Sequence, residues 1–247
     1  MSNAHLLWPY PRVVVHRGGG FHAPENTLEA FIEAERLGCS AVEFDVQTTA
    51  DGALVLCHDE YLGRVVQGKG RVCEMTAEQL RGLSVINPER PEQKPARVAF
   101  FDEAVQLCSR LGLMMNVELK PASGHESVLA EAAAAAFDSF AVNVLVLVSS
   151  FSAECLAEFH RLQPKLPCGF LYETEDVDWK TIAREIKVQT VHPEKRFAVP
   201  EMIAAAHAMG LGVLAWTTDA VDEAQKLMQN GADALCTNRP EILTFLH

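Results

Sequence analysis

The amino-acid sequence predicts an α/β protein built as a TIM (β/α)8 barrel. A length of 247 residues suits one such barrel, so we expect a single domain over 1–247. Short β-branched runs alternate with longer amphipathic runs from end to end, which is typical of parallel strands joined by helices. Nine short runs occur, and eight remain as parallel strands once a hairpin partner is set aside.

The strands are expected where the short apolar runs lie, at 12–16, 41–47, 54–58, 113–119, 144–149, 168–172, 188–192, 212–216 and 233–237. Asp51-Gly52 between the second and third runs is a hairpin signal, so the third strand should pair antiparallel to the second. The amphipathic runs predict helices at 27–37, 101–111, 126–139, 153–162, 178–186, 200–209 and 220–229.

Residues 60–97 interrupt this alternation. The segment is rich in glycine and proline and has one short helical pattern, at 77–83. We expect an insertion after the second strand that lies over the catalytic face as a lid or a side wall. A loosely ordered surface loop is the alternative.

The charge of the chain limits its partners. It carries 33 acidic and 21 basic residues, a net charge of −12, which would repel nucleic acid and anionic membranes. The mean hydropathy is +0.04, and no apolar run approaches the roughly 18 residues of a membrane span. We therefore expect a small-molecule ligand, received at a local positive site if it is anionic. The sequence does not distinguish a monomer from a homo-oligomer.

The cysteines favour a cytoplasmic location. There are seven, an odd number, scattered through mostly apolar stretches, and no Cys-x-x-Cys pair occurs. They are expected to be reduced core residues rather than a disulfide framework or a zinc site. No charged and apolar leader precedes the first predicted strand.

Three carboxylates stand where apolar strands end. Glu43 and Asp45 are two residues apart on one strand and so share one face, as do Glu118 and Lys120 on another. In a barrel, strand ends meet at the active-site mouth, so Glu43, Asp45 and Glu118 should converge. Converging carboxylates need a cation, and all-oxygen ligation favours one hard divalent ion, Mg²⁺ or Ca²⁺, over zinc.

Two histidines also follow apolar runs directly. His16 comes after Val13-Val14-Val15, and His58 comes after the run at 54–57. Imidazoles beside a metal and two cations are suited to act as general acid and general base near neutral pH. The residues do not say which histidine has which role.

A dinucleotide site is a competing interpretation of the first loop. Gly18-Gly19-Gly20-Phe21-His22-Ala23 fits G-x-G-x-x-A after a strand, and Glu43 lies about 20 residues further on. Pro24 opposes it, because the helix of that motif should already have begun there. Asn26 is expected to cap a helix that begins later, and His16-Arg17 separates the strand from the glycines.

The motifs together resemble the glycerophosphodiester phosphodiesterase family over about residues 8 to 240. The first motif is His16-Arg17-Gly18, and Trp8-Pro9-Tyr10-Pro11 ahead of it resembles the cytosolic bacterial branch. The others follow in order: Pro24-Glu25-Asn26-Thr27, Glu43-x-Asp45, His58-Asp59, Glu118-x-Lys120, Ser149-Ser150-Phe151 and Trp216-Thr217. The resemblance implies a TIM barrel with an insertion after the second strand.

The resemblance implies an enzyme of glycerol and lipid metabolism that hydrolyses glycerophosphodiesters, such as glycerophosphocholine or glycerophosphoethanolamine, to glycerol 3-phosphate and an alcohol. It implies that His16 and His58 are the catalytic acid and base. The resemblance implies further roles for these residues: Glu43, Asp45 and Glu118 bind the divalent metal, Arg17 and Lys120 hold the phosphate, Glu25 and Asn26 complete the first loop of the substrate site, and Trp216 lines the glycerol side.

The sequence departs from the family pattern at Gly63-Arg64-Val65, at Phe100-Phe101 and at Thr218-Asp219, where the family commonly has Val-Asn. We expect these positions to lie in the lid and rim and to affect substrate preference rather than chemistry.

Two other functions remain open. A lyase of the phospholipase D toxin type would stop at a cyclic phosphate. A catalytically silent barrel would only bind a phosphorylated metabolite.

Overall fold

The computed structural model describes residues 8–140 and 142–246, so residues 1–7, 141 and 247 of the predicted domain lie outside the described residues. Eight parallel strands form a closed barrel in the order β1-β11-β10-β9-β8-β7-β6-β2, and Val15 of β1 pairs with Val42 of β2 to close it. The predicted TIM barrel is confirmed. Its strands are β1 (Val13–Val15), β2 (Ala41–Thr48), β6 (Met114–Leu119), β7 (Val146–Ser150), β8 (Cys168–Tyr172), β9 (Thr190–Pro193), β10 (Gly212–Ala215) and β11 (Ala234–Thr237).

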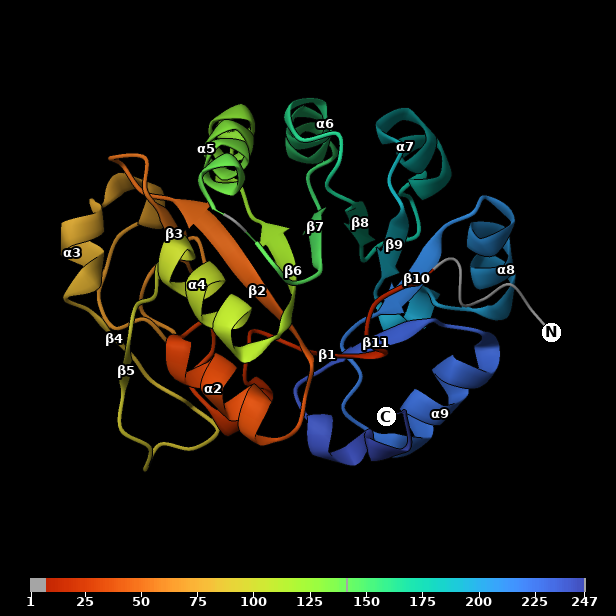
Figure 1. Ribbon diagram of the computed structural model, residues 1–247, viewed down its shortest axis with the longest axis horizontal. Helices are drawn as coiled ribbons and strands as arrows, with labels where there is room; N and C mark the ends of the chain where they lie inside the picture. The colour runs from red at the N-terminus through yellow and green to blue at the C-terminus, as the bar shows by residue number, and fades with distance from the viewer. Residues whose placement is uncertain (1–7, 141, 247) are drawn as a thin grey trace.

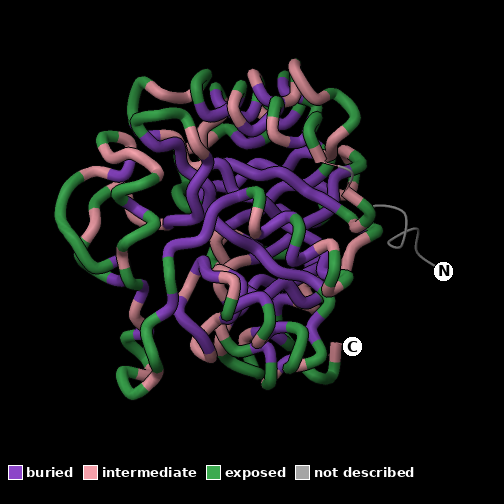
Figure 2. The backbone as a smooth tube through the Cα atoms, turned by 60° about the vertical axis from the view of Figure 1, so that its left-hand side comes forward, coloured by how far each residue is buried: buried purple, intermediate pink, exposed green. Residues whose placement is uncertain are grey.

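Helices surround the strands on the outside of the barrel (Figure 1). Phe31, Phe44 and Phe101 are fully buried between the two layers, and the buried part of the chain runs through the central strands (Figure 2). This layer holds the main hydrophobic core, as expected for helices that turn one apolar face to a sheet. The helices are α2 (Leu28–Arg36), α4 (Phe101–Leu111), α5 (Glu126–Ser139), α6 (Ala153–Leu162), α7 (Trp179–Ile186), α8 (Pro200–Ala208) and α9 (Val221–Asn230).

The predicted hairpin is confirmed. Strand β3 (Leu54–Leu56) pairs antiparallel to β2, with Val46 opposite Leu56 and Thr48 opposite Leu54. Gly52 in the turn has φ 82°, a conformation that glycine adopts without steric cost. The hairpin carries the chain from the end of β2 back along the barrel and into His58.

The predicted helix cap at Asn26 is wrong. Thr27 is the N-cap of α2, and its side-chain oxygen accepts a hydrogen bond from the backbone N of Ala30. Asn26 lies one residue earlier, at φ 57°, and its side chain points to Asp45 instead. Both residue types make good caps, so composition alone did not separate the two positions.

Period-two alternation sorts the strand residues between two faces. Val14, Ala41, Met114, Leu147 and Leu214 point to the barrel interior, where they pack with Trp8 as a separate apolar cluster. Positions two and four residues after Ala41 on the same face are Glu43 and Asp45. The apolar cluster thus fills the barrel beneath its polar, carboxyl-terminal mouth.

The insertion at 60–97 contains a helix, α3 (Ala77–Arg81), and a two-stranded sheet of β4 (Ser84–Val85) and β5 (Ala96–Arg97). Figure 1 places these elements at one side of the barrel, beyond α2 and α4. Val65, Val72 and Leu80 are buried there in a second hydrophobic cluster that also includes Phe100. This packing excludes a loosely ordered loop. Phe100 lies in the core of the insertion, whereas Phe101, at the start of α4, lies in the main core rather than in the lid or rim where it was expected.

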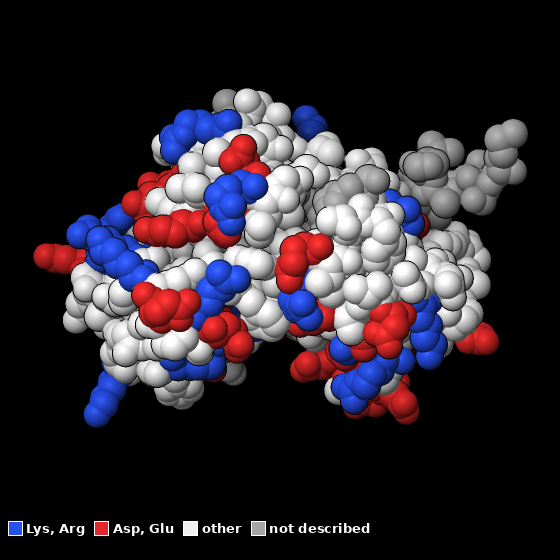
Figure 3. Space-filling view, turned by 90° about the horizontal axis from the view of Figure 1, so that it is seen from below, with Lys and Arg blue, Asp and Glu red and all other residues white. Residues whose placement is uncertain are grey.

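The cysteines and the charged side chains are distributed as the composition predicts. All seven cysteines are free, six of them buried and Cys73 half-buried. In the part of the chain that the structure describes, no helix has both the length and the apolar character needed to cross a membrane. Acidic and basic side chains are interspersed over the face seen in Figure 3.

Candidate active site

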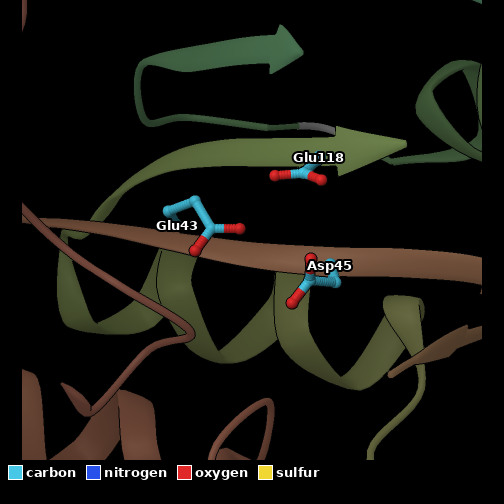
Figure 4. Close-up of side chains that lie close together, drawn as sticks. All are labelled: Glu43, Asp45 and Glu118. Atoms are coloured by element: carbon cyan, nitrogen blue, oxygen red, sulfur yellow. The ribbon is translucent and has the colours of Figure 1, made fainter. Parts of the chain in front are cut away.

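Glu43, Asp45 and Glu118 meet inside the mouth of the barrel. Asp45 on β2 stands opposite Glu118 on β6, so the register of the two strands brings these carboxylates side by side (Figure 4). One carboxylate oxygen from each residue lies within 4.8 Å of the others, and all three side chains are buried. The predicted convergence is confirmed.

The surroundings of the three carboxyl groups separate their pKa values. Burial and the neighbouring carboxylates raise the pKa of Glu43 well above its ordinary value. Burial, and to a smaller extent the negative charge of Asp45, raise the pKa of Glu118 to about 7. Burial alone would also raise the pKa of Asp45. The positive charges of Lys120, His58 and Arg17 instead bring it down to about 2, so Asp45 carries the firm negative charge of the group.

Arg17 and Lys120 supply the positive charge at the mouth. Lys120 Nζ lies 3.3 Å from Glu118 Oε1 and 3.6 Å from Asp45 Oδ1. Arg17 Nε lies 3.8 Å from Asp45 Oδ2, and the backbone N of Arg17 donates to Glu43 Oε2 at 2.8 Å. These two residues form the local positive site that an anionic substrate requires in an acidic protein.

The cluster of three carboxylates formed by Glu43, Asp45 and Glu118 fits a divalent cation. If all three carboxyl groups are ionised, each of the three pairs of charges within 4.8 Å repels by roughly 3 kcal/mol or more at an effective dielectric constant of about 20, which a bound cation would offset. Glu43 Oε1 is buried with no hydrogen-bond partner, a cost that a bound cation would remove. The donors are all carboxylate oxygens, the ligands of hard ions. The site can therefore hold a divalent metal.

His16 and His58 flank the carboxylates. His16 follows β1, and its Nε2 lies 3.9 Å from Glu43 Oε2 while its Nδ1 lies 2.8 Å from Asn238 Oδ1. Burial and the charge of Arg17 lower the pKa of His16 to about 4. His58 lies against Asp59, with 2.8 Å between Nδ1 and Asp59 Oδ1. Burial lowers the pKa of His58 too, although Asp45 and the hydrogen bond to Asp59 oppose that shift.

A cavity of about 360 Å³ opens over these side chains. Its apolar side is formed by Trp216 and Phe151, whose rings meet edge to face at 5.4 Å between centroids. Trp216 Nε1 donates to the backbone O of His192 at 2.9 Å, which fixes the indole at the wall. The cavity is lined by His16, Arg17, Glu43, Asp45, His58, Asn116, Glu118, Lys120, Phe151, Leu171, Glu173, Leu214, Trp216, Thr217 and Cys236.

Glu25 and Asn26 do not line this cavity. Glu25 accepts hydrogen bonds from Arg17 Nη1, at 3.0 and 2.9 Å, and from Arg64 Nη2, at 2.6 Å. Arg64 in turn donates to Asp59, so an ion-pair chain runs from Arg17 through the insertion to His58. Glu25 thus orients two arginines, and buried Asn26 contacts Asp45.

Some residues of the site carried no predicted role. Asn116 is buried beside Glu43 in the register of β2 and β6 and has the same period-two spacing to Glu118, a signal that was available in the sequence. Asn238 lies beside His16, a contact that depends on barrel closure, and Asp219, which was expected only to affect substrate preference at the rim, contacts Asn238. A second cavity of about 210 Å³ adjoins the first at His16 and Arg17 and is lined on the insertion side by Arg64 and residues 87–89.

Comparisons with known proteins agree with this geometry. Residues 16–242 match the model of the glycerophosphoryl diester phosphodiesterase family. The chain is 30% identical to a glycerophosphodiester phosphodiesterase of Bacillus altitudinis, over 93% of this chain and 95% of that protein. It is 29% identical to one from Caldanaerobacter subterraneus subsp. tengcongensis, over 95% of this chain and 96% of that protein.

Solved structures give the same result. An Oleispira antarctica phosphodiesterase, solved in complex with the product sn-glycerol-3-phosphate, superposes with a TM-score of 0.89 at 28% identity and covers 96% of each chain. A glycerophosphoryl diester phosphodiesterase from Silicibacter pomeroyi, described as putative in that structure, gives 0.87 at 26% identity, over 96% of this chain and 92% of the other. The family match extends over nearly all of the barrel, from His16 to Ile242, and this chain belongs to the glycerophosphoryl diester phosphodiesterase family.

Proposed function

We propose that this protein hydrolyses glycerophosphodiesters, such as glycerophosphocholine or glycerophosphoethanolamine, to glycerol 3-phosphate and an alcohol. The observation that carries the proposal is the convergence of three carboxylates and two histidines on one cavity in a chain of this family. The sn-glycerol-3-phosphate bound by the Oleispira antarctica relative supports the product. We propose Mg²⁺ or Ca²⁺ as the cofactor, because both prefer carboxylate oxygens.

The charges of the site suit this substrate. Next to the candidate metal position, the three carboxylates outnumber the cations Arg17 and Lys120 by one negative charge. One bound divalent cation would convert this excess into one positive charge. A phosphodiester carries one negative charge, so the loaded site and the substrate would be complementary.

We propose that Arg17 and Lys120 bind the phosphate oxygens. Both side chains border the cavity next to the carboxylates, so oxygens held by them would lie against the metal site. A divalent cation, when bound there, supplies positive charge where negative charge builds on the phosphate oxygens. The two side chains add to that stabilisation with donors that are already in place.

The hydrogen-bond partners of the two histidines suggest their roles. His58 Nδ1 contacts the carboxylate of Asp59, which stabilises a protonated imidazole, whereas His16 Nδ1 contacts a neutral amide. We propose that Nε2 of His16 accepts a proton from the attacking nucleophile, which is water or the neighbouring glycerol hydroxyl. His58 then gives a proton to the oxygen of the departing alcohol as the phosphorus–oxygen bond breaks.

The glycerol part and the alcohol part of the substrate would contact different walls of the site. Trp216, with Phe151 against it, supports a glycerol side lined by aromatic rings. Arg64 of the insertion pairs with Asp59, which contacts His58, the proposed proton donor to the departing alcohol. We propose that the insertion of the single catalytic domain acts as a side wall for the alcohol rather than as a cover over the whole mouth.

Phosphorus-31 NMR of glycerophosphocholine incubated with the protein and Mg²⁺ or Ca²⁺ tests the proposal. We expect the diester signal to be replaced by that of glycerol 3-phosphate, whether water or the neighbouring glycerol hydroxyl attacks first. A cyclic glycerophosphate that accumulates and persists would indicate the lyase. A diester that binds the protein but is not converted would indicate the catalytically silent barrel.

We further propose a cytoplasmic location. Six of the seven free cysteines are buried within the fold, which suits a reducing compartment.

A further inference from the structure

Strand pairing places an asparagine beside His16. Strands β1 and β11 run parallel, with Val15 opposite Thr237, so the next residues along each strand, His16 and Asn238, are neighbours at the mouth of the barrel. The backbone N of His16 donates to Thr237 O at 2.8 Å, and His16 Nδ1 lies 2.8 Å from Asn238 Oδ1. The end of β11 therefore contacts His16 twice, once at its backbone N and once at its imidazole.

Asp219 determines which end of the Asn238 amide faces the histidine. Asp219 Oδ2 accepts from Asn238 Nδ2 at 2.9 Å, and Asp219 Oδ1 accepts from the backbone N of Asn238 at 2.8 Å and from Thr237 Oγ1 at 3.2 Å. A carboxylate only accepts hydrogen bonds, so the amide nitrogen must face Asp219 and the amide oxygen must face His16. An amide oxygen has no proton to give, and the proton of this contact must lie on His16 Nδ1.

We propose that Asp219 and Asn238 are positioning residues that hold neutral His16 in the tautomer with the proton on Nδ1. Its Nε2 lone pair then faces the cavity, on the side of Glu43 Oε2. This inference rests on the proposed function, because it explains how His16 is kept ready to accept a proton. The opposite tautomer would set two lone pairs against each other at 2.8 Å.

The backbone around Asn238 keeps this contact in place. The backbone O of Asn238 accepts from the N of Phe21 at 2.9 Å, and a Cβ atom added to Gly20 would collide with the same oxygen. Gly20 has φ 55°, so any other residue would be strained there as well. The glycine loop after β1 thus packs directly on the backbone of Asn238, which fixes the position of that residue.

The first experiment is nitrogen-15 NMR of the full chain labelled at histidine, at about pH 8, with His16→Gln used to assign the His16 signals. In the native protein we expect the proton of His16 on Nδ1. In Asn238→Ala and in Asp219→Asn we expect the His16 signals to move toward the average of the two tautomers. Unmoved signals in both variants would overturn the proposal, whatever the activity.

Kinetics with glycerophosphocholine provide the second readout. We expect kcat to fall on the order of 10- to 100-fold in Asn238→Ala, with KM changed by less than about twofold. The matched control Asn230→Ala, at the end of α9, should leave kcat unchanged. Both variants should keep the native affinity for Mg²⁺ or Ca²⁺, measured by calorimetry. Retained affinity would show that the three carboxylates of the metal site and the fold are intact.

A double exchange gives the sharpest test. Asp219→Asn alone removes the carboxylate that orients Asn238, and Asn238→Asp alone sets two carboxylates against each other. In the double variant, the amide at position 219 donates to the carboxylate at position 238, and the net charge equals that of the native protein. The carboxylate at position 238 then faces His16 Nδ1. We expect the double variant to recover the Nδ1 tautomer and at least about tenfold in kcat over either single variant. Failure to recover the tautomer would contradict the proposal even if the native protein hydrolysed no diester.

Discussion

Asn26 holds Asp45 by two hydrogen bonds. Its side-chain Nδ2 donates to Asp45 Oδ2 at 2.7 Å, and its Oδ1 accepts from the backbone N of Asp45 at 3.0 Å. Asn26 is only 3% exposed, so its side chain acts inside the site rather than on the cavity surface. The left-handed backbone at Asn26, φ 57°, gives the side chain this direction.

Removal of the Asn26 side chain should weaken metal binding. Asn26→Gly keeps the left-handed backbone accessible but frees Asp45, so we expect the affinity for Mg²⁺ or Ca²⁺ to fall about 10- to 100-fold. Calorimetric titration measures the change, with Asn230→Ala as the control. Native affinity in Asn26→Gly would mean that Asp45 needs no such support.

The stability of the metal-free protein should depend on pH through Glu118. Burial raises its pKa from an ordinary value of 4.5 to about 7 in the folded protein, so the folded state holds the proton more tightly than the unfolded state. This contribution to stability is fully present below about pH 4.5 and is lost as the pH rises through about 7. The free energy of unfolding should therefore fall across this range, and less so in Glu118→Gln.

Urea unfolding at several pH values between about 4.5 and 8 measures this slope. Glu201→Gln, at an exposed position of α8, is the matched control and should behave like the native protein. A divalent cation at about 100 times its Kd should restore about 2.7 kcal/mol to the native protein at pH 8. Identical slopes in native protein and Glu118→Gln would rule out this role of the carboxyl group.

The two histidines should respond differently to the leaving group. A general acid matters only as far as the leaving group needs its proton, so p-nitrophenolate should bypass it. His58→Ala should lose on the order of 10² to 10⁴ in kcat on glycerophosphocholine and far less on the activated diester. His16→Ala should lose a similar factor on both substrates.

Steady-state kinetics of both variants, with bound metal quantified in each, check this assignment. The reverse pattern would exchange the roles of His16 and His58. Losses below about tenfold on glycerophosphocholine in both variants would leave a metal site that acts by charge alone.

Arg64 should connect the insertion to catalysis. It pairs with Glu25 and with Asp59, which contact Arg17 and His58 respectively. Arg64→Gln leaves both carboxylates without this partner, so we expect kcat/KM for glycerophosphocholine to fall about tenfold or more while metal affinity stays native. Arg196→Gln, which removes an exposed arginine paired with Glu194, is the control. Equal kinetics in the two variants would reduce the Arg64 contacts to surface ion pairs of little consequence.

Local pattern predicted most of the fold, since hydrophobic periodicity is a property of neighbouring residues. The helices at 101–111, 126–139 and 153–162 have the predicted bounds, and strand ends differ from the predicted ones by at most two residues. The antiparallel β3 was predicted from Asp51-Gly52 alone. The two-residue strands β4 and β5 were not predicted, because so short a pairing leaves no periodic signal.

Site residues at strand ends could be predicted from the sequence, whereas contacts that form only when the barrel closes could not. Glu43, Asp45 and Glu118 converge because period two and strand order are enough to place them. The contact of His16 with Asn238 joins residues 222 positions apart and exists only because β11 closes against β1. Asp219 was expected to act at the rim on substrate preference, whereas it contacts the partner of His16.

The proposed hydrolysis of glycerophosphodiesters requires a divalent metal held by Glu43, Asp45 and Glu118. Its most direct test is the rate of glycerol 3-phosphate release from glycerophosphocholine by metal-depleted protein before and after addition of Mg²⁺ or Ca²⁺, for the native chain and for Glu118→Gln. We predict no release without metal, recovery in the native chain, and recovery in the variant only at a much higher metal concentration. Full release by the metal-depleted native protein would contradict a metal-dependent reaction at these carboxylates.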